Sequence, residues 1–134
     1  MMDGLNAHVD PGPGALVYSI QSGLDPRKLN AVLVSHSHPD HYTDAEVLIE
    51  AMAGSATKRR GRLFCSKSVV EGVGDCGPSV SKYHRGLLEE VVAMEPGDRY
   101  SFGGFEVIAA RAAHTDPSAI GFIICDRRSG VRIG

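Results

Sequence analysis

Hydrophobic residues in this chain fall into short runs separated by turns rich in glycine and proline. The apolar run at 29–34 has polar residues on both sides, which predicts a strand buried on both faces, as in a parallel sheet. Further strands are expected just before the Pro/Gly turn at 11–14 and at 62–66, 99–102, 105–109, 119–125 and 131–133. Glycine at 103–104 predicts a hairpin turn between two of these strands, and residues 129–130 predict a second one.

Helices are expected between the strands, at 15–22, at 68–73, at 80–88 and after residue 43. Thr43 and Glu46 have the spacing of a capping box, in which each side chain satisfies a free N–H group of the first helical turn. That helix ends at Gly54, which favours a stop. Residues 35–42, before this helix, are crowded with polar side chains and contain Pro39, which predicts a loop. The alternation of strands and helices predicts an α/β fold.

The composition is that of a soluble globular chain. Apolar residues make up 43% and charged residues 22% of the 134 positions, which excludes a disordered, collagen-like or coiled-coil protein. No run approaches the ~18 apolar residues of a membrane span, and the first residues lack the pattern of a secretory signal. The net charge of −2 gives no overall attraction to nucleic acid or to an anionic membrane. Three cysteines without a C-x-x-C pair predict a reduced protein of the cytoplasm.

His36, His38, Asp40 and His41 form the strongest chemical signal in the chain. They lie in the polar loop after a predicted buried strand, where the ligand sites of α/β folds collect. Imidazole and carboxylate groups are natural ligands of zinc and similar metals. Residues i and i+2 of an extended segment point to the same side, so the first two histidines can reach one ion and the last two residues a second point nearby. This array suits a two-metal hydrolytic site, whereas a plain surface loop does not require four such residues.

These four residues resemble the H-x-H-x-D-H motif of the metallo-β-lactamase superfamily. The segment 9–12, in which Asp10 follows a short strand, is similar to the first motif of that family. His114 stands where the third motif supplies one more ligand. Order and context agree from about Asp10 to the end of the chain. The resemblance implies an αββα sandwich of two sheet–helix halves, with the metals at one edge between them.

The resemblance also implies roles for the matched residues. The ligand sets it implies are His36, His38 and His114 for a first metal ion and Asp40 and His41 for a second. Asp40 would also orient a metal-bound hydroxide and pass a proton to the leaving group, which makes it the expected catalytic residue. Asp10 would support the ligands or serve a structural role as a turn cap. The expected cofactor is Zn²⁺, one or two ions, with Mn²⁺ or iron as alternatives.

The segment 114–122 indicates the substrate class. It resembles the His-then-Gly-aromatic pattern of the branch that contains tRNA 3′-processing endonucleases, small phosphodiesterases and ascorbate-phosphate lactonases. Flavodiiron-type relatives carry an acidic residue where His38 stands, so His38 argues against an oxygen-reducing iron site. The resemblance therefore implies a metal-dependent hydrolase that acts on a phosphoester or a lactone rather than on a β-lactam.

Two later motifs of the family are missing, an Asp that bridges both metals and a final His. The later acidic candidate is Asp126, and no histidine follows His114. We therefore expect residues 1–134 to form a partial domain, roughly half to two-thirds of the sandwich. Its apolar face would be exposed or covered by a partner chain, for example a second copy in a homo-oligomer. A truncated or non-catalytic metal-binding module without turnover is the alternative hypothesis.

Lys58, Arg59 and Arg60 form a basic cluster that could hold phosphate groups. A charge run of this length is more often a solvated loop. If the cluster does bind phosphate, an RNA-binding module is a third hypothesis, and its affinity would depend steeply on salt. The expected partners are thus a small-molecule or phosphoester substrate and, through this cluster, RNA, with no membrane partner.

Overall fold

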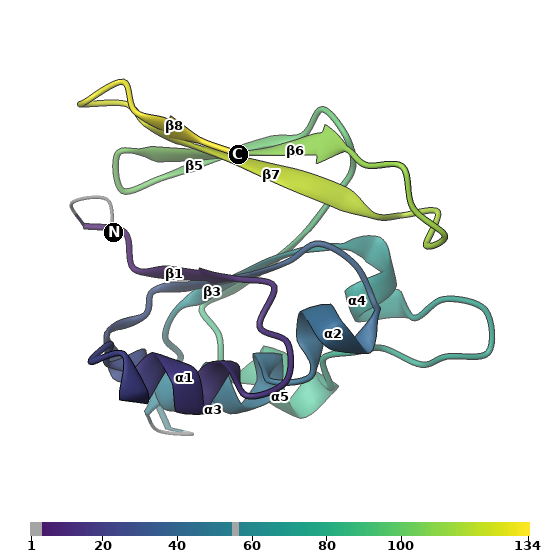
Figure 1. The fold of residues 1–134 in the computed structure, drawn as a ribbon, viewed down its shortest axis with the longest axis horizontal. Coiled ribbons are helices and arrows are strands. Elements are labelled where there is room, and N and C mark those ends of the chain that lie inside the picture. The colour runs from purple at the N-terminus through teal and green to yellow at the C-terminus, as the bar shows by residue number, and fades with distance from the viewer. Residues whose placement is uncertain (1–3, 55–56) are drawn as a thin grey trace.

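The computed structural model describes residues 4–54 and 57–134, which form three stacked layers (Figure 1). Helices cover one face of a first sheet, and a second sheet lies against its other face. The first sheet is parallel and contains, in spatial order, β1 (Ala7–Val9), β2 (Ala31–Val34), β3 (Arg62–Ser66) and β4 (Glu90–Met94). The second is antiparallel and contains β5 (Arg99–Phe102), β6 (Phe105–Arg111), β7 (Ile120–Asp126) and β8 (Arg132–Ile133). The helical segments are α1 (Ala15–Gln21), the 3₁₀ turn η1 (Pro26–Lys28), α2 (Pro39–Tyr42), α3 (Ala45–Ala53), α4 (Lys67–Glu71) and α5 (Lys82–Gly86).

The connections within the first sheet explain why the helices lie on one side of it. Its strands follow one another in space as they do in sequence, and all run parallel. Every crossover therefore turns in the same sense, and crossovers between parallel strands are almost always right-handed. The helical segments gather on one face as a result (Figure 1). Within the described ranges, no helix has the length and apolar character that a membrane crossing requires.

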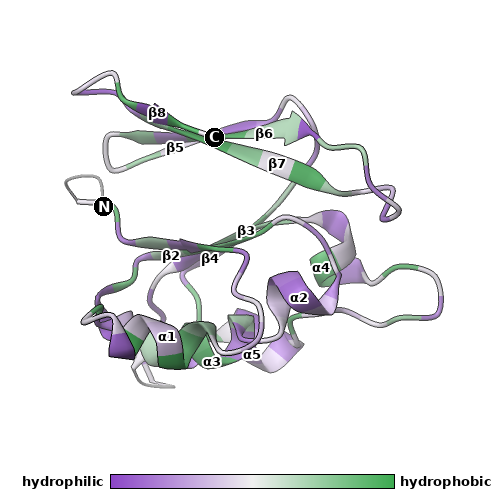
Figure 2. Cartoon of the chain, in the orientation of Figure 1, coloured by the Kyte–Doolittle hydropathy of each residue, from purple (hydrophilic) through white to green (hydrophobic). Residues whose placement is uncertain are grey.

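Alternate residues of β2 face two different cores, so the prediction of a strand buried on both faces is confirmed. Val32 and Val34 belong to the core under the helices, together with Leu48 of α3. Leu33 belongs with Phe64 to a second core between the two sheets. From the second sheet, this core receives Phe105, Val107, Ala109, Ile120 and Ile124. Figure 2 shows the hydrophobic colour on α3 and on much of β7, which supply one core each.

The second sheet covers the inner face of the first sheet and forms the second core with it. No helix of the described residues covers the outer face of that second sheet (Figure 1). Ile123 and Cys125 lie on this outer face, since they alternate with the inward Ile124, and both are half-buried. A homo-oligomer that covers the exposed apolar face of the partial sandwich stays a prediction.

The predicted capping box of Thr43 and Glu46 is wrong, because α3 starts with Asp44 as its N-cap and without a side-chain capping bond. The carboxylates of Asp44 and Glu46 accept hydrogen bonds from other elements instead. Asp44 Oδ2 accepts a hydrogen bond from the N–H of Leu16 at 3.0 Å. Glu46 Oε1 accepts one from the N–H of Ser81 at 2.7 Å. Contacts with distant parts of the chain thus replace a pattern that is plausible locally.

Two other segments differ from their predictions. The expected loop at 35–42 contains a single helical turn, α2, which Pro39 begins at the position where proline suits a helix. The helix expected at 80–88 is shortened to α5, and the strand β4 that follows was not predicted. In β4 only Met94 is buried, because the strand forms the edge of its sheet.

Candidate metal centre

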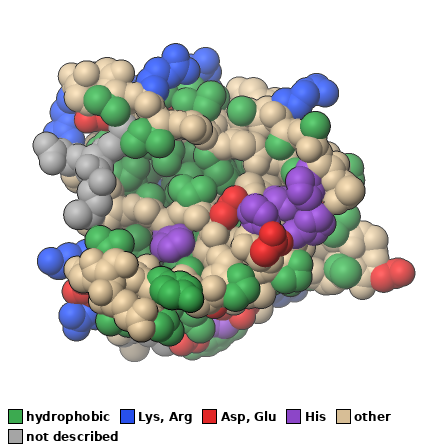
Figure 3. All heavy atoms as spheres, viewed as in Figure 1, with side chains coloured by type: hydrophobic (Ala, Val, Ile, Leu, Met, Phe, Trp, Pro, Cys, Tyr) green, Lys and Arg blue, Asp and Glu red, His purple; other side chains and the backbone are tan. Residues whose placement is uncertain are grey.

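The histidine cluster lies where the carboxyl ends of the parallel strands meet a loop of the second sheet. β2 leads directly into His36 and His38, and β1 leads into Asp10. The loop 112–119 joins β6 to β7 and carries His114. Figure 3 shows a group of histidine side chains with acidic side chains beside it, and another histidine that lies apart from this group. The two sheets therefore contribute ligand candidates to the same edge.

Three histidines offer ring nitrogens to a common point. One ring nitrogen each of His36, His38 and His114 lies within 4.8 Å of the other two. The ring centroids are 4.7 Å apart for His36 and His38, 4.6 Å for His38 and His114, and 4.1 Å for His36 and His114. His36 is buried, whereas His114 is exposed. This arrangement fits a zinc site with three imidazole ligands and one open position.

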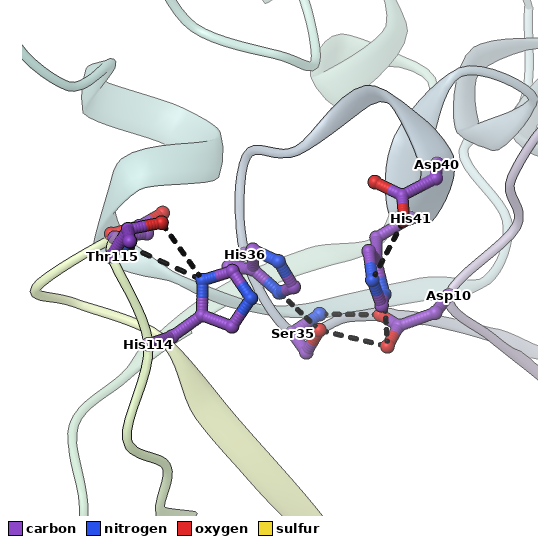
Figure 4. Close-up of polar contacts among 8 residues, drawn as sticks. Asp10, Ser35, His36, Asp40, His41, His114 and Thr115 are labelled. Atoms are coloured by element: carbon purple, nitrogen blue, oxygen red, sulfur yellow. Dashed lines mark hydrogen bonds and ion pairs between the residues drawn. The ribbon is translucent and has the colours of Figure 1, made fainter.

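Asp10 and Ser35 orient two of the rings through a chain of hydrogen bonds (Figure 4). The carboxylate of Asp10 accepts bonds from the N–H and the hydroxyl of Ser35, each at 2.7 Å, and lies 3.0 Å from Nδ1 of His41. The hydroxyl oxygen of Ser35 lies 2.8 Å from Nδ1 of His36. Because the serine donates to Asp10, it can accept the Nδ1–H of His36, which leaves Nε2 free for a ligand. Asp10 has a φ of 48°, a backbone conformation that is uncommon for residues other than glycine.

Nε2 of His36 is the atom that tests whether a metal fits this cluster. It is buried and has no hydrogen-bond partner among the described residues. Leaving a buried polar atom unpaired costs about 1–3 kcal/mol. Burial lowers the pKa of His36, and the nearby rings of His41, His114 and His38 lower it further. A neutral ring with a free lone pair among other imidazoles suits a divalent metal ion.

Asp40 and His41 lie on α2, next to these three histidines. The ring centroid of His41 is 4.2 Å from that of His36, and its Nε2 is 3.5 Å from Oδ2 of Asp40. The side chain of Asp40 is 76% exposed. Gly12 allows the turn that carries Asp40 to approach, since a Cβ at Gly12 would lie 2.0 Å from the carbonyl oxygen of Asp40. Within the described ranges, the ligand atoms that all lie within 4.8 Å of one another belong to His36, His38 and His114. Asp40 and His41 are not part of this group.

Asp116 is part of the site, and the sequence pattern did not single it out. Its side chain is buried, with the residue 4% exposed. Burial alone would raise the pKa of Asp116, but hydrogen bonds from Ser68, Ser118 and Ser37 hold it at about 2. The carboxyl group is therefore ionised. The spacing of Asp116 and Ser118 is typical of a turn in which an Asp side chain binds the backbone two residues on. This spacing is the feature of the sequence that could have identified Asp116.

The basic cluster lies away from this centre. It precedes β3 and so lies at the amino end of a parallel strand, whereas the histidines follow the carboxyl end of β2. Arg60 is held by the protein itself, since its backbone N–H donates to the carbonyl of Leu87 at 3.0 Å and its guanidinium donates to the carbonyl of Met52. Lys58 and Arg59 are exposed. A phosphate held by this cluster would lie outside the metal centre, and RNA binding there stays a prediction.

The helix–sheet–sheet layers and the histidine edge together define a class of proteins that hold divalent metals at the rim of a two-sheet fold. The family model described as "Beta-lactamase superfamily domain" matches residues 6–133. The chain belongs to this superfamily. The resemblance found in the sequence is therefore confirmed at the level of the family.

The proteins similar to this chain include examples from Methanocaldococcus jannaschii, Pyrococcus abyssi and Bacillus subtilis. The chain is 47% identical over 118 residues to "Uncharacterized protein MJ1374" of Methanocaldococcus jannaschii, covering 88% of the chain and 44% of that protein. It is 27% identical over 119 residues to a protein named Ribonuclease Z from Pyrococcus abyssi, covering 88% and 38%. A solved structure with the same fold is the metallo-β-lactamase fold protein YhfI from Bacillus subtilis, with a TM-score of 0.66 and 22% identity, covering 94% and 48%. The chain spans less than half the length of the curated relatives it matches, so a partial fold is confirmed.

Proposed function

We propose that this chain binds a divalent metal ion through His36, His38 and His114 and provides part of a hydrolytic site for a phosphoester or a lactone. The observation that carries the proposal is the convergence of three ring nitrogens within 4.8 Å. The buried Nε2 of His36, which lacks a partner among the described residues, supports it. Zn²⁺ is the ion we expect, because three imidazoles with one open position are its usual catalytic environment.

The chain's own residues divide the work around that ion. A bound divalent ion supplies Lewis acidity, which lowers the pKa of a water molecule and polarises the group under attack. Asp10 and Ser35 hold protons on Nδ1 of His41 and His36, so that Nε2 of each ring stays available. Asp40 has an exposed carboxylate beside His41, where it can accept a proton from water and pass it to a leaving group.

The substrate class rests on similarity. The segment 114–122 resembles the branch of the superfamily that cleaves phosphoesters and lactones. The 27% identity to a protein named Ribonuclease Z supports a phosphoester. The match covers only 38% of the length of that relative. Turnover by these 134 residues alone is therefore the part of the proposal that most needs a test.

Metal content is the first measurement. The chain would be purified without chelator and analysed by plasma mass spectrometry, next to His36→Ala and His84→Ala. His84 is a matched control, because its ring lies on α5 with its nitrogens 3.1 Å from Glu46 and 3.0 Å from Glu50. We expect at least one ion per wild-type chain, the same in His84→Ala and near-complete loss in His36→Ala. A metal-free wild-type chain that also takes up no added Zn²⁺ would contradict the proposal.

Turnover is the second measurement. The metal-loaded chain would be assayed with bis(p-nitrophenyl) phosphate and with an aryl lactone, with Asp40→Asn in parallel. Hydrolysis that depends on metal and falls at least about 100-fold in Asp40→Asn would support general acid–base catalysis by this residue. Metal binding without hydrolysis of either compound would instead support the alternative of a metal-binding module.

A further inference from the structure

Asp116 lies where its own loop, between β6 and β7, meets the loop after β2 and the first turn of α4. Its Oδ2 accepts hydrogen bonds from the N–H of Ser37 at 3.2 Å and from the hydroxyl of Ser68 at 2.6 Å. Its Oδ1 accepts bonds from the N–H and the hydroxyl of Ser118, each at 2.9 Å. Ser37 separates the two histidines of the loop after β2, and Ser118 lies in the loop that carries the third. One carboxylate therefore connects the backbone segments that present all three expected ligands.

Directional bonds matter at this junction because the core between the two sheets is apolar, and a polar contact between the sheets such as the hydrogen bond from the hydroxyl of Tyr100 to Glu90 joins other strands, β5 and β4. Apolar contact is non-directional, so by itself it does not define the spacing of two loops to a fraction of an ångström. Two other polar bonds join these segments. Ile120 donates its N–H to the carbonyl of Ser35 at 3.1 Å, and Ser68 donates its N–H to the hydroxyl of Ser118 at 3.2 Å. Asp116 adds two bonds between the segments, to Ser37 and to Ser68, while its two bonds to Ser118 lie within its own loop.

The charge of Asp116 also supports a connection between this junction and the histidine cluster. The side chain is buried, and no ion pair with it is found in the described part of the chain. A buried charge without an opposite charge nearby is costly. The N–H of Asp116 lies 3.5 Å from Nδ1 of His114. A cation held by the histidine cluster would bring a positive charge to this junction.

We propose that Asp116 is a positioning residue for the metal centre, which it preorganises by holding the loop of His36 and His38 in register with the loop of His114. The inference rests on the proposed function, since it presupposes that the three histidines bind a metal. Residues that hold metal ligands in place typically change metal affinity by about 10–100-fold when they are removed. A residue that only stabilises the fold would not have this effect on an otherwise folded chain.

Asp126 offers a matched control at the other end of β7. It is 6% exposed, and its carboxylate accepts bonds from the N–H of Arg128 at 2.9 Å and the hydroxyl of Ser129 at 2.8 Å. It is thus also a buried Asp that binds a serine and a backbone N–H in a turn. The turn after β7 lies at the strand end opposite to the loop 112–119.

The experiment compares Zn²⁺ affinity, by competition with a chromophoric chelator, in wild type, Asp116→Ala, Asp116→Asn and Asp126→Ala. Urea unfolding of each metal-free chain gives the loss of stability separately. We expect Asp116→Ala to bind Zn²⁺ about 10–100-fold more weakly and Asp126→Ala to stay within about threefold of wild type, although both lose stability. Asp116→Asn keeps an oxygen for the Ser118 bonds, so its affinity should lie in between. The absorption of bound Co²⁺ should change in Asp116→Ala and not in Asp126→Ala.

Equal Zn²⁺ affinity in wild type and Asp116→Ala would overturn the inference and leave the proposed function intact. An equal loss of affinity in Asp126→Ala would overturn it as well, because the effect would then follow general stability. If wild type binds no metal, the proposed function fails first and the inference with it. If Asp116→Ala does not fold, Ser68→Ala replaces it, which removes the 2.6 Å bond to Asp116 together with the 2.9 Å bond between the hydroxyls of Ser66 and Ser68. An affinity equal to wild type in that variant would also count against the positioning role.

Discussion

The two sheets of this protein are built from similarly short strands but are buried differently. β2 of the parallel sheet is buried at all four of its positions, because helices cover one face and the second sheet covers the other. β5 of the antiparallel sheet alternates between exposed and half-buried positions, since only its inner face is packed. The burial of a strand thus depends on its neighbouring layers and, as for β4 and β5, on its position at the edge of its sheet. The candidate metal centre lies at the edge where the fully covered sheet meets the half-covered one.

Cysteine reactivity should show the largest contrast between the sheets. Cys65 on β3 is buried, and burial raises the pKa of its thiol from 9.0 to about 12. The thiolate is the reactive form, so this shift alone lowers the reactive fraction about 10³-fold. We expect iodoacetamide at pH 8 to label Cys125, on the outer face of β7, at least about 10³-fold faster than Cys65. Peptide mass spectrometry over time measures both, with the exposed Cys76 as a positive control. Equal rates would show that β3 is not covered on both faces.

Truncation of an aromatic side chain between the sheets should have the next largest effect. Phe64 is fully buried, and its ring lies 5.3 Å from that of Tyr100 and 5.4 Å from that of Phe102. Phe64→Ala should lower the free energy of unfolding by about 3–5 kcal/mol. Ile123→Ala, on the outer face of the second sheet, should lower it by only about 1 kcal/mol. Urea unfolding of both variants tests this, and similar losses would mean that the outer face is also covered in solution.

A smaller effect is expected where the turn after β1 approaches α2. A methyl group at Gly12 would lie 2.0 Å from a backbone oxygen of Asp40, so one of the two segments must shift. Gly12→Ala should cost about 1–3 kcal/mol of unfolding free energy. Gly77→Ala is the control, since nothing lies within 4 Å of its added methyl group and its φ is not positive. That variant should change stability by no more than about 1 kcal/mol, in the stabilising direction. Equal effects in the two variants would place the turn and α2 further apart in solution.

Much of the candidate site could be predicted because its residues are neighbours in the chain. His36, His38, Asp40 and His41 lie within six positions, and such a spacing is visible without any knowledge of the fold. His114 required the resemblance to a family. Asp116 was not predicted as a site residue, because its partner Ser37 is 79 residues away in sequence. A side chain whose bonding partners lie on another sheet leaves only a weak local signal.

The capping box failed for a related physical reason. Thr43 and Glu46 had the right spacing, but a local capping bond competes with any tertiary contact that the same groups can make. In the folded chain, Glu46 binds the N–H of Ser81 at the start of α5 instead. β4 was not predicted because its apolar run directly follows the segment 80–88, whose pattern indicated a helix, and a short apolar run does not distinguish strand from helix.

The sequence by itself determined the family through three short motifs, three of the four strands of the first sheet and the histidine loop, because each motif, strand and loop consists of residues that lie close together in the chain. Only the tertiary structure decided that the chain's second sheet closes the inner face of the first. It also decided that the basic cluster at 58–60 lies away from the histidines, and that Asp116 connects the loops of both sheets. These are distances between segments far apart in sequence. They are set by the packing of whole layers and by directional hydrogen bonds between them, which no local pattern encodes.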